Sequence, residues 1–174
     1  VGAGGGINVI MKTLLNPGDE VIVFTPYFIE YDFYAGNYGG VIKRVPTNDD
    51  FSLNLNALSE AISEKTRVII INSPNNPTGV IYPAEDLKQL GFLLNEKSEQ
   101  FGEPITLLSD EPYKKINFDC EVPSQFLYYE NTIVVTSHSK DLALPGERIG
   151  YIAISPKHQD SNILTNVAVI ALRI

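Results

Sequence analysis

Three short polar segments hold the residues whose types and spacing could do chemistry. They are Asn72–Gly79, Ser109–Tyr113 and Ser137–Lys140, and each directly follows an apolar run. Together they offer amide, carboxylate, phenol, hydroxyl and amine groups, which can transfer protons and, through the amine, form an imine. Ligands of open parallel sheets bind at the carboxyl ends of the strands. We therefore expect these three segments to converge on one site.

A glycine-rich segment, Gly2-Ala3-Gly4-Gly5-Gly6, is predicted to be a loop that immediately precedes a helix over Ile7–Leu15. The unpaired backbone N–H groups and the dipole of a helix start favour an anion such as phosphate. A glycine-rich turn that lets the helix pack closely is the alternative. The spacing excludes a dinucleotide-binding G-x-G-x-x-G motif, because Ile7 stands where the last glycine is required.

Lys140 lies three residues after a predicted strand, and a lysine taken singly is ordinarily a surface charge. Pyridoxal phosphate, however, needs an amine for its aldehyde, a carboxylate that keeps its ring nitrogen protonated, and donors to its phenolate oxygen. Its phosphate needs backbone N–H groups, a hydroxyl and a fixed positive charge. The sequence offers such groups at Lys140, Asp110, Asn76, Tyr113, Ser137, Arg148 and the backbone of Gly2–Gly4.

Six short β-branched runs are predicted to be the strands that position these groups. They are continuously apolar rather than alternating, which is typical of a parallel sheet covered by helices on both faces. A layered α/β fold is therefore predicted. The predicted strands are Val21–Phe24, Val41–Val45, Arg67–Ile71, Ile105–Leu108, Ile133–Thr136 and Ile149–Ile154.

Four helices are predicted from apolar spacing and end signals. The first, Ile7–Leu15, stops at the turn Asn16-Pro17-Gly18. Leu55–Ile62 is short and amphipathic, and Pro83–Phe101 is longer, with its proline in the first turn. Pro156 is expected to open the last helix.

Composition argues against several classes of protein. The 174 residues include 13 Lys and Arg against 21 Asp and Glu, a net charge of −8, without the basic cluster that a nucleic-acid partner needs. No apolar run approaches the roughly 20 residues of a membrane span. The single cysteine, Cys120, favours a reducing, cytoplasmic compartment. The start at Val1 and the helix that ends unclosed at Ile174 favour one domain, residues 1–174, excised from a longer protein.

Four motifs together resemble a known family. They are Asn76-Pro77-Thr78-Gly79, Asp110-Glu111-Pro112-Tyr113, Ser137-x-Ser139-Lys140 and Gly146-Glu147-Arg148-Ile149-Gly150. In order and spacing they are similar to the class I/II, fold-type I pyridoxal-phosphate enzymes, the aspartate aminotransferase family. The resemblance implies the cofactor-binding large domain of that fold, three-layered α/β/α with a mostly parallel sheet, truncated at both ends and lacking the small domain. It implies transamination between an α-amino acid and a 2-oxo acid, and a homodimeric full-length parent.

The resemblance also implies catalytic roles. Lys140 would form the imine with the cofactor and carry the proton between the substrate's α-carbon and the cofactor's C4′. Asp110 would pair with the pyridinium nitrogen and so keep the ring an electron sink. Asn76 and Tyr113 would hydrogen-bond the 3′ oxygen.

Phosphate binding and ring stacking are implied for five further residues. Ser137, Arg148 and the backbone N–H groups of Ala3 and Gly4 would bind the phosphate. Many relatives have Ser or Thr where this chain has Gly4, so a side-chain hydroxyl is lost there. Phe28 would stack on the cofactor ring, and ordinary core packing at a helix start is its alternative.

Several alternatives stay open at this stage. Another reaction of the same fold, such as β-elimination, decarboxylation or cyclopropane-carboxylate synthesis, is one, and a non-catalytic cofactor-binding module is another. In relatives, the arginine for the substrate's α-carboxylate lies in the portion absent here. His138 and Glu111 are expected to be structural neighbours, and His158 to be solvated at a helix start. The Asn76–Pro77 bond is either cis or trans.

Overall fold

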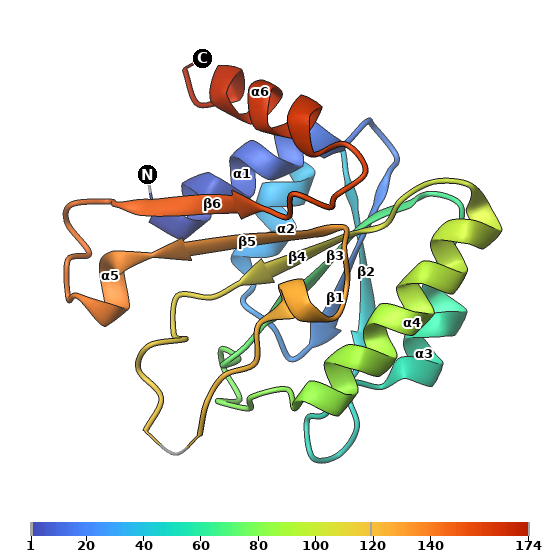
Figure 1. Ribbon diagram of the computed structural model, residues 1–174, viewed down its shortest axis with the longest axis horizontal. Helices are drawn as coiled ribbons and strands as arrows, with labels where there is room; N and C mark the ends of the chain where they lie inside the picture. Colours follow the sequence, from blue (N-terminus) through green and yellow to red (C-terminus); the bar gives the residue numbers. More distant parts are fainter. Residues whose placement is uncertain (1, 119, 174) are drawn as a thin grey trace.

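The computed structural model, which describes residues 2–118 and 120–173, contains one six-stranded sheet with helices against both faces (Figure 1). The strand order is β2-β1-β3-β4-β5-β6, in which the first five are parallel and β6 is antiparallel to β5. The predicted α/β fold with a mostly parallel sheet is confirmed. The strands are β1 (Glu20–Thr25), β2 (Val41–Pro46), β3 (Thr66–Asn72), β4 (Thr106–Asp110), β5 (Thr132–Ser137) and β6 (Gly150–Ile154). The helices are α1 (Gly2–Leu14), α2 (Glu30–Gly36), α3 (Leu55–Ala61), α4 (Ala84–Phe101), α5 (His138–Asp141) and α6 (Ser161–Ala171), with a 3₁₀ turn over Gln125–Leu127.

Both faces of the sheet are buried, which explains why its central strands are apolar throughout. Along β1, Ile22 and Phe24 belong to the hydrophobic cluster under α3 and α4. The alternate residues Val21 and Val23 belong to the cluster under α1, α2 and α6. Because successive strand side chains point to opposite faces, one strand contributes to both clusters. The three layers are visible in Figure 1.

Helix α1 begins at Gly2 rather than at Ile7, so the prediction of a glycine loop ahead of the helix is wrong. Glycine disfavours helix by about 1 kcal/mol relative to alanine, and tertiary packing overrides this propensity. A Cβ on Gly6 would lie 2.7 Å from Val135 Cγ1, so only glycine lets α1 lie directly on β5. The first-turn N–H groups, which have no partner within the helix, therefore belong to the glycine segment itself.

Helix α2 has no bounds in the sequence-based prediction, which offers a helix start only as the alternative interpretation of Phe28. It has seven residues, and Ile29 at its N-cap provides no side-chain cap, so the usual start signal is missing. Tyr31 and Ala35, one turn apart, are both buried in the cluster that covers the sheet. Packing rather than local sequence therefore makes this segment helical.

The last helix begins at Ser161, so the prediction that Pro156 opens it is wrong. Residues 156–160 form turns, in which His158 N donates to Ser155 O at 3.0 Å. His158 is buried rather than solvated, and its Nε2 lies 3.3 Å from Thr106 Oγ1. Burial lowers the pKa of His158. Packing of this imidazole against β4 holds residues 156–160 in turns, so the helix begins only at Ser161.

Val1 and Ile174, the ends of the predicted domain, lie outside the described residues.

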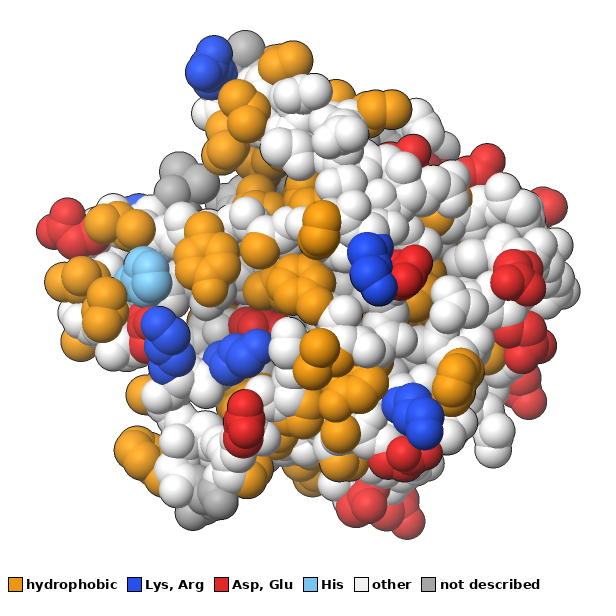
Figure 2. Space-filling view, in the orientation of Figure 1, with side chains coloured by type: hydrophobic (Ala, Val, Ile, Leu, Met, Phe, Trp, Pro, Cys, Tyr) orange, Lys and Arg blue, Asp and Glu red, His pale blue; other side chains and the backbone are white. Residues whose placement is uncertain are grey.

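One face of the molecule shows how its surface charge is distributed. In Figure 2, acidic side chains gather along the side that α3 and α4 occupy in Figure 1, and the Lys and Arg side chains are scattered. Across the part of the chain that the structure describes, no helix is both long and apolar enough to span a membrane.

Candidate active site

A cavity of about 340 Å³ lies where the carboxyl ends of β3, β4 and β5 meet the start of α1. Segments far apart in the sequence therefore share one space, as expected for an open parallel sheet. All nine residues predicted for the site line it: Ala3, Gly4, Phe28, Asn76, Asp110, Tyr113, Ser137, Lys140 and Arg148. Asn72, Glu30 and Tyr34, which were not among the predicted site residues, line it as well. Within the described ranges, no group of three or more His, Cys, Asp or Glu could hold a metal ion.

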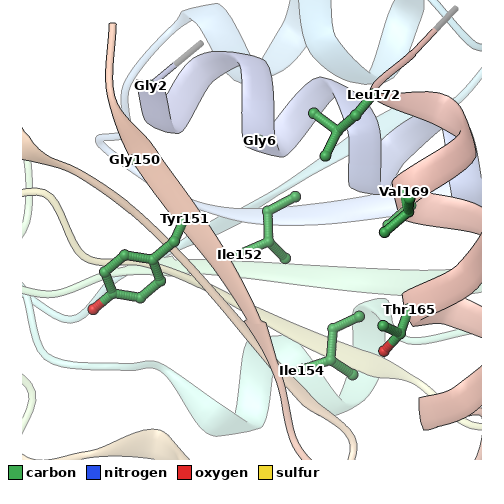
Figure 3. Close-up of a pocket in the computed structure, with 10 residues that line it drawn as sticks. Gly2, Gly6, Gly150, Tyr151, Ile152, Ile154, Thr165, Val169 and Leu172 are labelled. Carbon is green, nitrogen blue, oxygen red and sulfur yellow. The ribbon is translucent and has the colours of Figure 1, made fainter. Parts of the chain in front are cut away.

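A second hollow, between β6, α1 and α6, has a different character (Figure 3). Its volume is about 330 Å³, and aliphatic side chains such as Ile152, Ile154 and Val169 dominate its lining. In Figure 3 the Tyr151 ring points away from these side chains. None of the described residues that line this groove is charged, so it offers no acid–base chemistry.

Asp110 is the buried charge of the first cavity. It is the last residue of β4 and is 5% exposed, and its Oδ2 accepts a hydrogen bond of 2.7 Å from the Tyr31 hydroxyl. Its Oδ1 is also buried and has no hydrogen-bond partner among the described residues. Burial raises the pKa of Asp110 to about 7; the Tyr31 hydrogen bond opposes this rise and the charge of Glu111 adds to it. One carboxylate oxygen is thus held and the other is left for a ligand.

Asn72, at the end of β3, makes hydrogen bonds both to the end of β4 and to the loop that follows β3. Its Nδ2 donates to Asp110 O at 2.8 Å, and its Oδ1 accepts from Asn76 N at 2.6 Å. The loop is further closed by Asn75, whose Oδ1 accepts from Thr78 Oγ1 at 2.9 Å. The Asn76–Pro77 bond is cis, which answers the question that the sequence left open. These contacts hold the Asn76 side chain at the cavity.

Lys140 lies on α5, the short helix that follows β5, and is exposed. Its Nζ is 5.7 Å from the centre of the Tyr113 ring, so the amine and the phenol predicted for the site are neighbours. Ser137, the last residue of β5, is buried at the N-cap of α5. His138 instead has Nδ1 3.2 Å from Asp141 Oδ2 and does not line this cavity, as expected of a structural neighbour.

The anion-binding end of the cavity is formed by the start of α1 and by Arg148. A Cβ added to Gly2 would lie 3.2 Å from Arg148 Nη2, so the guanidinium group lies against the helix start. Arg148 Nη1 donates to Pro145 O at 3.2 Å. Backbone N–H groups, a helix dipole and a fixed cation at one place favour a phosphate.

The space beside Gly4 is occupied by a side chain of α2. A Cβ on Gly4 would lie 2.6 Å from Tyr34 Oη, so the Tyr34 hydroxyl takes up the space that a larger residue would need. This hydroxyl donates a hydrogen bond to Glu30. Burial and the Glu30 carboxylate raise the pKa of Tyr34, which therefore remains protonated.

Phe28 is packed against the core and also faces the cavity, and its stacking on the cofactor stays a prediction. It lines the cavity, and its ring also packs edge-on against Tyr31 with 5.6 Å between ring centres. Tyr31, Tyr34 and Glu30 were missed because the sequence predicted no bounds for α2. The cluster of aromatic residues directly after Pro26 is the signal that could have located them.

Comparisons with known proteins agree with this architecture. The family model for class I and II aminotransferases matches residues 1–172. A probable aspartate aminotransferase of Methanocaldococcus jannaschii is 33% identical over 167 residues, which are 95% of this chain and 43% of that protein.

Solved structures are similar over nearly the whole chain. An amino transferase from Eubacterium rectale superimposes with a TM-score of 0.96 at 40% identity, covering 99% of this chain and 44% of that one. The Thermus thermophilus aspartate aminotransferase with maleate gives 0.85 at 32% identity, covering 98% and 43%. The chain thus spans less than half the length of these relatives. Fold, motifs and matched residues together show that it belongs to the class I and II aminotransferase family.

Proposed function

We propose that this chain is the pyridoxal-phosphate-binding part of an aminotransferase that moves an amino group between an α-amino acid and a 2-oxo acid. The observation that carries the proposal is Asp110, a buried carboxylate whose Oδ1 has no partner within the described residues, in the same cavity as Lys140 and Arg148. A buried acceptor without a donor destabilises the fold. A protonated pyridine nitrogen is a donor of the kind that Asp110 lacks.

The opposite end of the cavity fits the other charged group of the cofactor. Arg148 and the backbone N–H groups of Ala3 and Gly4 would hold the phosphate, with the Ser137 hydroxyl as a further donor. A cationic ring nitrogen and an anionic phosphate thus have complementary partners within one cavity.

The remaining side chains supply proton transfer and orientation. When bound, pyridoxal phosphate supplies an electron-withdrawing ring that stabilises negative charge at the α-carbon of an amino acid. Lys140 would hold the amine that takes the proton from the α-carbon and delivers it to the cofactor's C4′. Asn76 and Tyr113 would donate hydrogen bonds to the ring oxygen, and Phe28 would pack against the ring. Asp110 would hold a negative charge for the ring nitrogen.

The extent of the functional unit is also a proposal. Because relatives are more than twice as long, we propose that this chain is their cofactor-binding large domain and that the residues for the substrate's α-carboxylate lie outside it. Similar proteins are named as aspartate, aspartate/prephenate and histidinol-phosphate aminotransferases, which supports amino and 2-oxo acids as the substrate classes. A homodimeric parent and a cytoplasmic location belong to the same proposal.

The test is covalent labelling of the chain with pyridoxal phosphate, followed by borohydride reduction and peptide mapping. We expect an absorption band of a lysine adduct and a label on Lys140. The Lys140→Ala variant should lose the label. The Lys157→Ala variant should keep it, because Lys157 is an exposed lysine paired with Glu130 at 3.1 Å and lies outside the cavity.

Label spread over surface lysines, or retained in Lys140→Ala, would overturn the assignment of Lys140. Amino transfer itself is then measured on the longer protein with radiolabelled amino donors. Labelling of Lys140 without any amino transfer there would favour elimination, decarboxylation or a non-catalytic role.

A further inference from the structure

Tyr31 on α2 is the direct partner of the buried carboxylate. Its hydroxyl donates to Asp110 Oδ2 at 2.7 Å across 79 residues of sequence, and the side chain is 2% exposed. No motif pointed to this residue. Its only polar group is directed at Asp110, so its role depends on what that carboxylate does.

The Tyr31 ring is held in place by its neighbours. The Phe28 ring meets it edge-on at 5.6 Å, and the Tyr27 ring stacks on it at 6.4 Å between centres. Burial and the negative charge of Asp110 raise the pKa of Tyr31 well above its usual value. The hydroxyl is therefore a permanent donor in a fixed position.

We propose that Tyr31 is a positioning residue that holds Asp110 Oδ2, so that Oδ1 alone is free for the ring nitrogen of the cofactor and the shared proton stays on that nitrogen. This inference rests on the proposed function. A donor to the charged form of a carboxylate makes the carboxylate a weaker base. Without the Tyr31 hydroxyl, the buried Asp110 becomes a stronger base and competes for the proton of the ring nitrogen.

Other titratable groups also act on Asp110 and must be held constant in any test. Glu111 follows it in the chain, Tyr34 faces it from α2, and Tyr113 follows β4. Lys140 and Arg148 line the same cavity from the segment after β5. Substituting Tyr31 by phenylalanine removes one hydroxyl and leaves all of these groups and the aromatic ring in place.

The matched control is Tyr129, which is also 2% exposed and whose hydroxyl donates at 2.7 Å to Ile105 O. It does not line the cavity. Tyr31→Phe and Tyr129→Phe therefore each remove a buried hydroxyl that donates at 2.7 Å, and Tyr129→Phe also removes the longer contacts of that hydroxyl with Ser98 Oγ at 3.2 Å and Asn131 Nδ2 at 3.5 Å. Only the first removes it from Asp110.

The first measurement follows the carboxyl titration of Asp110 by ¹³C NMR in the 174-residue chain without cofactor, with the signal assigned by Asp110→Asn. We expect Tyr31→Phe to raise the titration midpoint by about one pH unit, a tenfold change in proton affinity, and Tyr129→Phe to leave it unchanged. Equal midpoints in the wild type and Tyr31→Phe overturn the proposal. This result does not depend on cofactor binding, so it separates failure of the inference from failure of the proposed function.

The second measurement is the ¹⁵N chemical shift of ring-labelled pyridoxal phosphate bound to the chain. We expect a protonated ring nitrogen in the wild type and in Tyr129→Phe, and a shift towards the unprotonated position in Tyr31→Phe. An unchanged shift overturns the proposal.

A third variant covers the case in which Tyr31→Phe does not fold. Incorporation of 3-fluorotyrosine at position 31 keeps the ring and makes the hydroxyl a stronger donor. We expect it to lower the Asp110 midpoint, opposite to the effect of phenylalanine. A midpoint that stays the same or rises counts against the proposal.

Discussion

The candidate active site has one buried half and one exposed half, and the two are built differently. Asp110 and Asn72 end central strands, are about 5% exposed, and are tied to each other and to Tyr31 by hydrogen bonds. Lys140 and Arg148 belong to the segment after β5, in which residues 142–149 are all exposed. The half that must keep a charge away from water is part of the core, whereas the half that must reach a ligand lies on the exposed segment formed by α5 and the residues after it. This division predicts that changes in the buried half alter both stability and binding, and changes in the exposed half alter binding alone.

The largest expected effect tests the free-energy penalty of the buried charge. The pKa of Asp110 is raised from 3.8 to about 7, so between these values the unfolded chain has lost its proton and the folded chain still holds it. The free energy of unfolding therefore falls as pH rises, by about 1.4 kcal/mol per pH unit, and is constant above about pH 7. Urea denaturation should show Asp110→Asn gaining on the wild type by on the order of 3 kcal/mol between pH 5 and pH 8. An equal difference at both pH values would show that Asp110 ionises without penalty.

A smaller effect is expected from Asn72→Ala, which breaks the link between two strand ends. It leaves the Asp110 carbonyl and the Asn76 N–H without their present partner, so we expect a loss of about 2 kcal/mol in the free energy of unfolding and weaker binding of pyridoxamine phosphate. Asn131→Ala is the control, because Asn131 also makes two side-chain hydrogen bonds but lies half-buried outside the cavity. If Asn72→Ala and Asn131→Ala weakened binding equally, Asn72 would have no special role in the buried half of the site.

The smallest effect is expected from Arg148→Gln in the exposed half. Loss of the guanidinium should weaken pyridoxamine phosphate binding about tenfold and change the free energy of unfolding by less than about 0.5 kcal/mol. Arg44→Gln, which removes an exposed arginine paired with Asp32 at 2.7 Å, should not change binding. Calorimetric titration with pyridoxamine, which lacks the phosphate, should give equal affinities for wild type and Arg148→Gln. A loss of affinity for that ligand too would place Arg148 elsewhere in the site.

The sequence predicts more of the strands and of the motif residues than of the contacts between them. Continuous apolar runs identify the strands because both faces of the sheet are covered. Four short motifs, together with the family resemblance, identify nine residues that line one cavity. The role of Tyr31 could not be predicted, because its partner is 79 residues away and its helix has no cap signal. The start of α1 and the burial of His158 were mispredicted for the same reason. In both cases long-range packing outweighs local preference.

The strand order has a consequence for the sequence of events during folding. The cavity is lined by the start of α1 and by the segments that follow β1, β3, β4 and β5. The lining residues after β5 lie in the local β5–β6 hairpin, but the strand order β2-β1-β3-β4-β5-β6 brings the separate segments together only through long-range contacts. Contacts of such high sequence separation form late, because each requires closure of a long loop. The cavity cannot exist while any of β3, β4 or β5 is unpaired. A ligand would therefore bind only to chains in which the central sheet has formed. A ligand present during synthesis would stabilise those chains and no others.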